Sequence, residues 1–257
     1  MSQALSNLAP GAMIKIQETV AGVSRDIQFR VLAHGHHAAG ATTLVRNQVW
    51  VPNLPFNDTN LFIYKDSAVD NWCQNEYLSY FSKAVEAAIV SVPITTALSG
   101  DSPFDYADIS RKAFLLSRAE LGFGVGAFAV EGTLIPYFNA NARRVANKDG
   151  TATATFWWTR TTRTVVAPAG SNSSESNPQN VTYSSYRPAF CLPSTLEVSD
   201  TPDGDGCYIP IFPEPETGGI RVKVGGEYAS AAGIRLKQGG IWRPGEERVK
   251  DGGEWLQ

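Results

Sequence analysis

Residues 151–193 read TATATFWWTRTTRTVVAPAGSNSSESNPQNVTYSSYRPAFCLP, and the predicted fold is organised around this stretch. The alternation over 151–155 predicts a strand that continues through FWW at 156–158. A polar loop over 170–180 follows, and an aromatic strand then returns over 181–190. We expect these two strands to form the centre of one compact domain.

The aromatic and basic residues of this stretch allow two interpretations. Trp157 and Trp158 are adjacent, so a strand directs their rings to opposite faces. Arg160 and Arg163 follow directly, and Arg187 lies on the returning strand. Either the tryptophans fill the core and the arginines pair with buried carboxylates or carbonyls, or the Trp/Arg edge and the polar loop form a ligand-binding surface. In the second case one ring lies at a rim, and alanine substitution of the two tryptophans should have different effects.

Composition limits the possible classes of protein. The chain has 257 residues, of which 43% are hydrophobic, 11% aromatic and 18% charged, with a net charge of −3. This indicates a folded protein with one large domain, or a domain with an appendage. The charge gives no general attraction to nucleic acid or to an anionic membrane, and we expect neither as a partner.

The N-terminal sequence and the cysteines indicate the compartment. MSQALSNLAPG lacks the basic and apolar regions of a signal peptide, and no apolar run approaches the ~18 residues of a membrane span. We therefore expect folding in a cytosol. Cys73, Cys191 and Cys207 are an odd number without a C-x-x-C pair, which favours reduced, mostly buried thiols.

The first half of the chain predicts strands and then helices. Strands are expected over 13–16 and 27–32, with a hairpin turn at Ala21-Gly22, and over 43–51. Ser67, with Asp70 three residues later, is a predicted helix N-cap. The helix that follows carries Trp72, Tyr77, Tyr80 and Phe81, and a second helix is predicted over 83–90. The fold class is therefore α+β, with two helices set against a mainly antiparallel sheet whose last strands hold the tryptophans.

The C-terminal 40 or so residues differ from the rest. A proline-spaced linker is predicted over 213–218, which separates a domain over 1–212 from a repeat over 219–257. The repeat reads IRVKVGGEY, IRLKQGGIW and RVKDGGEW. Each copy predicts a β-hairpin, because Gly-Gly accepts the positive φ angles of a two-residue turn and an aromatic residue opens the return strand. So small a segment makes a poor core alone, so we expect it to pack on the main domain or on other copies.

Three clusters of residues are candidate sites. His34, His36 and His37 lie in one short stretch without a fourth ligand in sequence, which favours an exposed loop over a metal site. Asp203 and Asp205 lack calcium-loop spacing, which favours a turn. The glycines of 122–126 lack the lysine and hydroxyl residue of a phosphate loop. We therefore predict no metal, no cofactor and no catalytic residue.

Five motifs resemble one known family. WWTRT followed by YRPAFCLP resembles the "WWLR … G-V-R-P-A" signature of uncharacterised domains with a C-type-lectin-like fold, found in phage tail proteins and in surface proteins of Gram-positive bacteria. Similar matches occur in the same order at 6–16, 42–50, 67–75 and 113–121. The C-terminal repeat is similar to repeats that end many phage tail proteins. True C-type lectins bind calcium and sugar through motifs that are absent from this sequence.

The resemblance implies a function. We expect a non-enzymatic phage virion structural protein of the tail or baseplate periphery. It would form a homo-oligomer, with a trimer favoured, and would contact other virion proteins and a host-surface glycan or protein. Two alternatives remain. One is a bacterial cell-surface adhesion module, and the other is an enzyme of the formylglycine-generating type, which shares the fold and would use Cys191 and Cys207.

Overall fold

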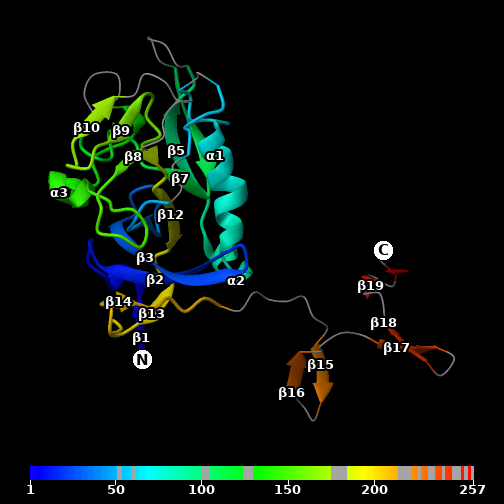
Figure 1. Cartoon of the computed structure of the whole chain (residues 1–257). Coiled ribbons are helices and arrows are strands. Elements are labelled where there is room, and N and C mark those ends of the chain that lie inside the picture. Colours follow the sequence, from blue (N-terminus) through cyan, green and yellow to red (C-terminus); the bar gives the residue numbers. More distant parts are fainter. Residues whose placement is uncertain are drawn as a thin grey trace. The chain divides into compact units, whose positions relative to one another are not determined.

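The computed structural model of the chain forms two compact units, Met1–Pro213 and Glu214–Gln257, called here the N-terminal and the C-terminal unit. It describes residues 1–50, 54–59, 62–99, 105–123, 130–174 and 184–213, and six strands of the C-terminal unit. The N-terminal unit is mixed α+β, with several sheets and few helices (Figure 1). In the described part of the chain, every helix is too short or too polar to cross a membrane.

A six-stranded sheet forms the centre of the N-terminal unit, in the order β14-β2-β3-β4-β12-β7. β14 runs parallel to β2, and each of the other neighbouring pairs is antiparallel. The strands are β2 (Met13–Val20), β3 (Val23–His34), β4 (Ala41–Arg46), β7 (Ala113–Leu115), β12 (Pro188–Pro193) and β14 (Cys207–Tyr208). The returning strand predicted over 181–190 is divided between two sheets. Ser184–Ser185 form a short strand beside the one that carries the tryptophans, and Pro188–Pro193 form β12 inside the six-stranded sheet.

The predicted first hairpin is confirmed. Val20 pairs with Val23, and Ala21 and Gly22 connect them with φ angles of 49° and 78°. Two successive positive φ angles define the primed turn that matches strand twist. The third predicted strand ends earlier than expected, at Arg46, because the Arg46 guanidinium bonds the carbonyl oxygens of Gln48 and Val49 and the chain bends around it.

The tryptophans lie in a different sheet from the one predicted. β8 (Phe156–Trp158) belongs to a four-stranded sheet in the order β10-β9-β8-β11, with β9 at Thr164–Val166, β10 at Asn172–Ser174 and β11 at Ser184–Ser185. Figure 1 shows β8, β9 and β10 at the end of the unit opposite β14. The sequence predicted that Trp157 and Trp158 lie in the last strands of the sheet that packs against the two helices. That prediction is wrong.

The prediction of a strand over 151–155 is also wrong. The chain turns there, since the backbone N–H of Thr151 bonds the Lys148 carbonyl and Gly150 has a φ of 70°. Within this segment Ala154 makes an isolated bridge to Asn147. The residues at 151–153 are exposed. The alternation of Thr and Ala there does not come from one buried and one exposed face of a strand.

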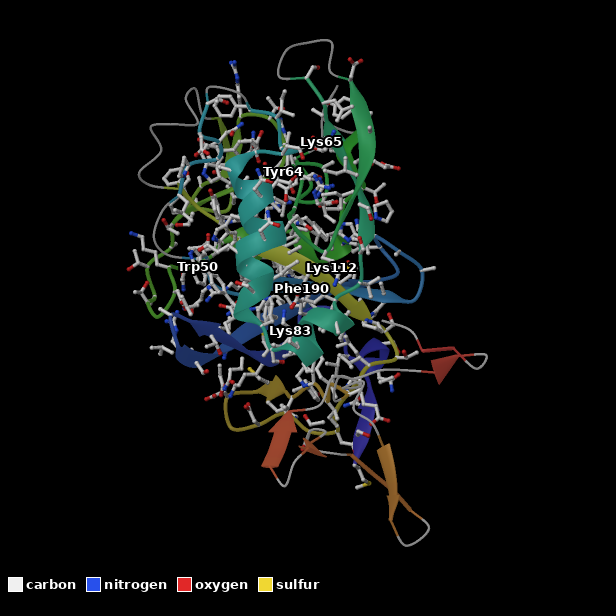
Figure 2. The ribbon with its side chains drawn as sticks, turned by 90° about the vertical axis from the view of Figure 1, so that its right-hand side faces the viewer. Trp50, Tyr64, Lys65, Lys83, Lys112 and Phe190 are labelled. Carbon is white, nitrogen blue, oxygen red and sulfur yellow. The ribbon has the colours of Figure 1, made fainter. Side chains whose placement is uncertain are left out.

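The helical segment begins as predicted. The Ser67 hydroxyl accepts the backbone N–H of Asp70 at the start of α1 (Ala68–Asn71). A π-helical turn (Trp72–Glu76), a 3-10 turn (Tyr77–Tyr80) and α2 (Lys83–Ala88) follow. Phe81 packs on the rings of Phe29 and Phe190, at centroid distances of 6.2 and 5.5 Å. In Figure 2 this segment crosses in front of the strand that carries Phe190.

Smaller elements complete the N-terminal unit. β5 (Val92–Ala97) pairs with β6 (Tyr106–Arg111), and β1 (Ser2–Ala4) pairs with β13 (Glu197–Ser199). A short helix α3 (Asn141–Arg144) precedes β8, and single 3-10 turns lie at Leu5–Asn7 and Pro136–Phe138. β5 matters for function, because it forms one wall of the candidate site below.

The C-terminal repeat forms three antiparallel strand pairs. β15 (Arg221–Val224) pairs with β16 (Glu227–Ser230), β17 (Arg235–Gln238) with β18 (Ile241–Pro244), and β19 (Lys250–Asp251) with β20 (Glu254–Trp255). Each pair joins the two halves of one repeat copy, as the sequence predicts for hairpins. The Gly-Gly pairs and the linker over 214–218 lie outside the described residues.

Candidate functional site

Trp157 and Trp158 both lie in the interior, each with 0% of its surface exposed. Their rings diverge, as strand alternation requires. The Trp157 indole N–H bonds the Arg144 carbonyl oxygen at 3.1 Å, and that of Trp158 bonds the Leu54 carbonyl oxygen at 3.2 Å. Both faces of β8 are therefore covered, and neither ring lies at a rim.

Arg160 is buried just beyond β8, and it uses its whole hydrogen-bonding capacity. A guanidinium has five N–H donors. They bond the carbonyl oxygens of Thr95, Leu115 and Glu131 at 3.0, 3.0 and 2.7 Å, and both Glu120 carboxylate oxygens at 2.7 and 2.6 Å. Arg160 thus ties β5, β7 and two loops together around one carboxylate.

Glu120 is held from every side. Its Oε2 also accepts the backbone N–H of Ser117, and the Ser117 hydroxyl accepts the backbone N–H of Glu120 in return, which is a capping box. Burial alone would raise its pKa, but the Arg160 charge and a hydrogen bond from His37 outweigh burial and hold the Glu120 pKa well below its usual range. Glu120 is therefore ionised in the folded protein.

The two histidines reach Glu120 from the loop between β3 and β4. His37 Nε2 lies 3.1 Å from Glu120 Oε1, and its Nδ1 lies 2.8 Å from the Thr43 hydroxyl. The His36 ring packs edge-on against the His37 ring at a centroid distance of 4.8 Å. Burial lowers the His36 pKa, so that His36 is neutral at pH 7. His34 is exposed as expected, but it ends β3, and its ring nitrogens bond the Thr42 hydroxyl and the Leu8 carbonyl oxygen. The His37 side chain is only 4% exposed, so the prediction of an exposed loop is wrong for His37.

A second buried acid lies close by. The Glu131 carboxylate accepts the Thr161 hydroxyl and the Ala97 backbone N–H. Burial raises the Glu131 pKa despite the nearby Arg160 charge. Gly132 follows with a φ of 130°, and a β-carbon there would meet Glu120 at 3.1 Å, so the close approach of this wall needs glycine.

These side chains line one pocket of about 170 Å³. Its walls are formed by His36, His37, Glu120, Glu131, Arg160 and Gly132, together with Pro93, Ile94 and Thr95 of β5 and Thr133. Ligand atoms of His36, His37 and Glu120 all lie within 4.8 Å of one another. Five titratable side chains of the described residues thus meet around one cavity, which is the candidate site.

Arg187 and Arg163 lie outside this cluster. Arg187 is buried, with its guanidinium 5.0 Å from the Trp157 ring centroid, and it donates to the carbonyl oxygens of Arg46, Arg144 and Asn47. Burial lowers its pKa. Arg163 is exposed, and its guanidinium lies 5.2 Å from the Phe62 ring centroid. Of the five residues considered as a binding surface, four are therefore interior, which favours the core interpretation for them.

An open groove lies on the helical side of the unit. It has a volume of about 430 Å³ and is lined by Asn71, Trp72, Asn75, Glu76 and Tyr186, among others. Amide and carboxylate groups line it together with two largely buried aromatic side chains. This groove is exposed, unlike the Trp/Arg segment.

The cysteines and the aspartate turn agree with the sequence predictions. Cys73, Cys191 and Cys207 are unpaired and buried. Burial raises the pKa of all three thiols, that of Cys191 to about 12. Asp203 and Asp205 form a turn whose carboxylates bond the Lys15 ammonium, so a cation of the protein itself occupies this acidic pair.

Comparisons with known proteins give one family. A model described as a domain of unknown function, DUF6273, matches residues 40–194, which is more than half of the chain. The chain belongs to the DUF6273 family. No curated protein and no solved structure shows significant similarity to it. Glu120, Arg160 and Arg187 lie inside the DUF6273 match, and His36 and His37 lie just before it.

Glu120 and Glu131 were not among the predicted site residues. A signal for Glu120 was present, because Ser117-x-x-Glu120 is the pattern of a capping box. That pattern predicts a local hydrogen bond, however, and gives no information about Arg160 or His37. Only the fold brings these segments together, across 40 and 83 residues of sequence.

Proposed function

We propose that this chain is a non-enzymatic structural protein of a bacteriophage virion, at the periphery of the tail or baseplate. The observation that carries the proposal is that the charged side chains of the candidate site bond other groups of the protein. All five N–H donors of Arg160 bond protein acceptors. The Glu120 carboxylate is hydrogen-bonded to Arg160, His37 and Ser117. Groups held in this way stabilise a scaffold and are poorly placed to turn over a substrate.

The proposal includes a C-type-lectin-like fold for the N-terminal unit and assembly into a homo-oligomer with a trimer favoured. The sequence resemblance supports the fold, and the mixed α+β architecture is compatible with it. The strand pairs of the C-terminal unit support assembly, because isolated two-stranded hairpins are marginal in water and gain stability from packing on other copies or on other virion proteins.

We place contact with a host-surface glycan or protein at the open groove rather than at the Trp/Arg segment. Sugar hydroxyls bond amides and carboxylates, and the groove offers Asn71, Asn75 and Glu76. Binding of the full chain to host cells tests this point. We expect Asn75→Ala to weaken binding and Lys83→Ala, on an exposed side chain at the start of α2, to leave it unchanged. Equal binding by both variants contradicts the groove assignment.

A formylglycine-generating-type enzyme is the less favoured alternative. Such chemistry needs a reactive thiolate, and a thiol whose pKa is raised stays protonated at neutral pH. Burial raises the pKa of both Cys191 and Cys207. The adhesion-module alternative shares the groove and differs in location, on a cell rather than on a particle.

Labelling of the producing particles tests the main proposal. Negative-stain imaging with an antibody to this chain should show label at the tail or baseplate. Label on the bacterial envelope in particle-free cultures would instead support the adhesion module. Oxidation of a cysteine peptide by the purified chain would overturn the non-enzymatic assignment.

A further inference from the structure

We propose that His36, His37 and Glu120 form a binding site for a divalent transition metal, with Zn²⁺ as the best fit. The inference goes beyond the structural role proposed above and does not depend on it. Two imidazoles and one carboxylate are a ligand set that zinc accepts in proteins, whereas calcium and magnesium prefer oxygen ligands throughout.

The separation of two of the ligand atoms already fits a metal. His37 Nε2 and Glu120 Oε1 lie 3.1 Å apart. Two zinc bonds of about 2.0–2.1 Å at a tetrahedral angle place their ligand atoms roughly 3.3 Å apart. A zinc ion can therefore join these two atoms with a shift of a few tenths of an ångström.

His36, the third ligand, must move further than the other two, and rotation of its side chain allows this. Ligand atoms of the three residues lie within 4.8 Å of one another, so the His36 ring has only a short distance to move. His36 sits on the connection between β3 and β4, where its ring contacts the His37 ring and lines the pocket. Rotation of the side chain about its own bonds suffices for such a shift.

The surrounding groups hold the ligands in a usable state. Thr43 bonds the other ring nitrogen of His37, as outer groups commonly do for a metal-bound histidine. A hydroxyl both donates and accepts, so Thr43 can hold Nδ1 while Nε2 faces a metal ion.

The positive charge of Arg160 disfavours a cation in the pocket, but the carboxyl groups of Glu120 and Glu131 lie in the same pocket. Arg160 bonds both oxygens of Glu120, which fixes the orientation of this ligand. Glu131 lines the same pocket and is buried. The pocket thus has a second acidic group beside the Arg160 guanidinium.

Three protein ligands leave one coordination position open. The pocket of about 170 Å³ faces that position and has room for water. An arrangement of three protein ligands and an open position differs from the closed set of four found in structural zinc sites. The site would therefore bind zinc exchangeably and would not be a structural zinc site that the fold requires.

Metal titration of the full chain tests the proposal. The protein is prepared without a polyhistidine tag and treated with a chelator, and Zn²⁺ affinity is measured by competition with a chromophoric chelator. We expect one Zn²⁺ per chain. His36→Gln should weaken binding by at least about tenfold, because even a change in an outer group costs 10–100-fold. His34→Gln is the matched control, since exposed His34 lies on the same segment but outside the pocket.

Cobalt gives a second readout that does not depend on affinity alone. Co²⁺ in the wild-type chain should show the strong visible absorption of a tetrahedral site, and His36→Gln should lose it. Circular dichroism of both variants verifies folding. The proposal is overturned if wild-type protein binds no Zn²⁺, if His36→Gln binds it as tightly as wild type, or if His34→Gln loses as much affinity as His36→Gln.

Discussion

Arg160 and Glu120 face each other in a two-bond ion pair inside the N-terminal unit, with Nη1 2.7 Å from Oε2 and Nη2 2.6 Å from Oε1. Both side chains are at most 2% exposed. Arg160 follows β8, and Glu120 follows β7, so the pair joins the four-stranded sheet to the six-stranded sheet. The stability of the contact between the sheets should therefore depend on it.

Glu120→Gln should destabilise the protein by about 3–5 kcal/mol, because it leaves a buried guanidinium without its countercharge. Urea unfolding of the full chain measures the effect. Glu86→Gln removes the half-buried partner of exposed Lys83 and is the control, with an expected loss under about 1 kcal/mol. Similar small losses for both variants would show that the Arg160 charge is satisfied by carbonyl oxygens alone.

Trp157→Ala and Trp158→Ala should each cost about 3–5 kcal/mol, since both rings are fully buried. Half-buried Phe156 on the same strand provides the comparison, and Phe156→Ala should cost less. Thermal and urea unfolding give the three values. A small loss for either tryptophan would mean that its side of β8 is open, which would restore the binding-surface interpretation.

Alkaline pH should destabilise the protein through its buried thiols. Burial raises the Cys191 pKa to about 12, above the ~8.5 of an exposed thiol. The folded state therefore keeps a proton that the unfolded state releases. This contribution is complete below about pH 8.5 and is lost as the pH rises toward the folded pKa, by about 1.4 kcal/mol per pH unit.

Unfolding of wild type and of Cys191→Ala between about pH 8.5 and 11 checks this sign. The variant starts less stable, because a buried side chain is shortened, but its stability should fall less steeply with pH. Thiol reagents should also react with native protein much more slowly than with unfolded protein. Identical slopes for the two proteins would exclude Cys191 as a source of the alkaline loss.

The C-terminal hairpins give a prediction that rests on sequence. Gln238 pairs with Ile241, and two glycines stand between them in the chain. A primed turn needs a positive φ, so Gly239→Val should destabilise this hairpin and Gly239→Asn should be tolerated. Proteolysis of this segment in the two variants and in wild type measures the difference. Equal protection of the Val and Asn variants would contradict the turn assignment.

Assembly is the remaining prediction. Light scattering of the purified chain at micromolar concentration should show a multimer, with a trimer favoured. A chain that ends at Pro213 tests whether the C-terminal unit contributes, and it should associate more weakly. A clean monomer for both proteins would remove the homo-oligomer from the proposed function.

The sequence by itself determined the local elements. Alternation and Ala21-Gly22 predicted the β2–β3 hairpin, Ser67 and Asp70 predicted the helix start, and the repeat predicted the strand pairs of the C-terminal unit. These features depend on backbone preferences and hydrogen bonds that span a few residues, so a local pattern is sufficient to reveal them.

The tertiary structure alone decided which sheet holds the tryptophans, which side chains are buried and where the charged groups meet. Alternation showed that Trp157 and Trp158 point in opposite directions, but the cover of each face comes from distant segments. Likewise Glu120 carried a local capping pattern, while its partners His37 and Arg160 lie 83 and 40 residues away. Such contacts are set by the packing of whole sheets, because the free energy of burial depends on what the rest of the chain places around a side chain.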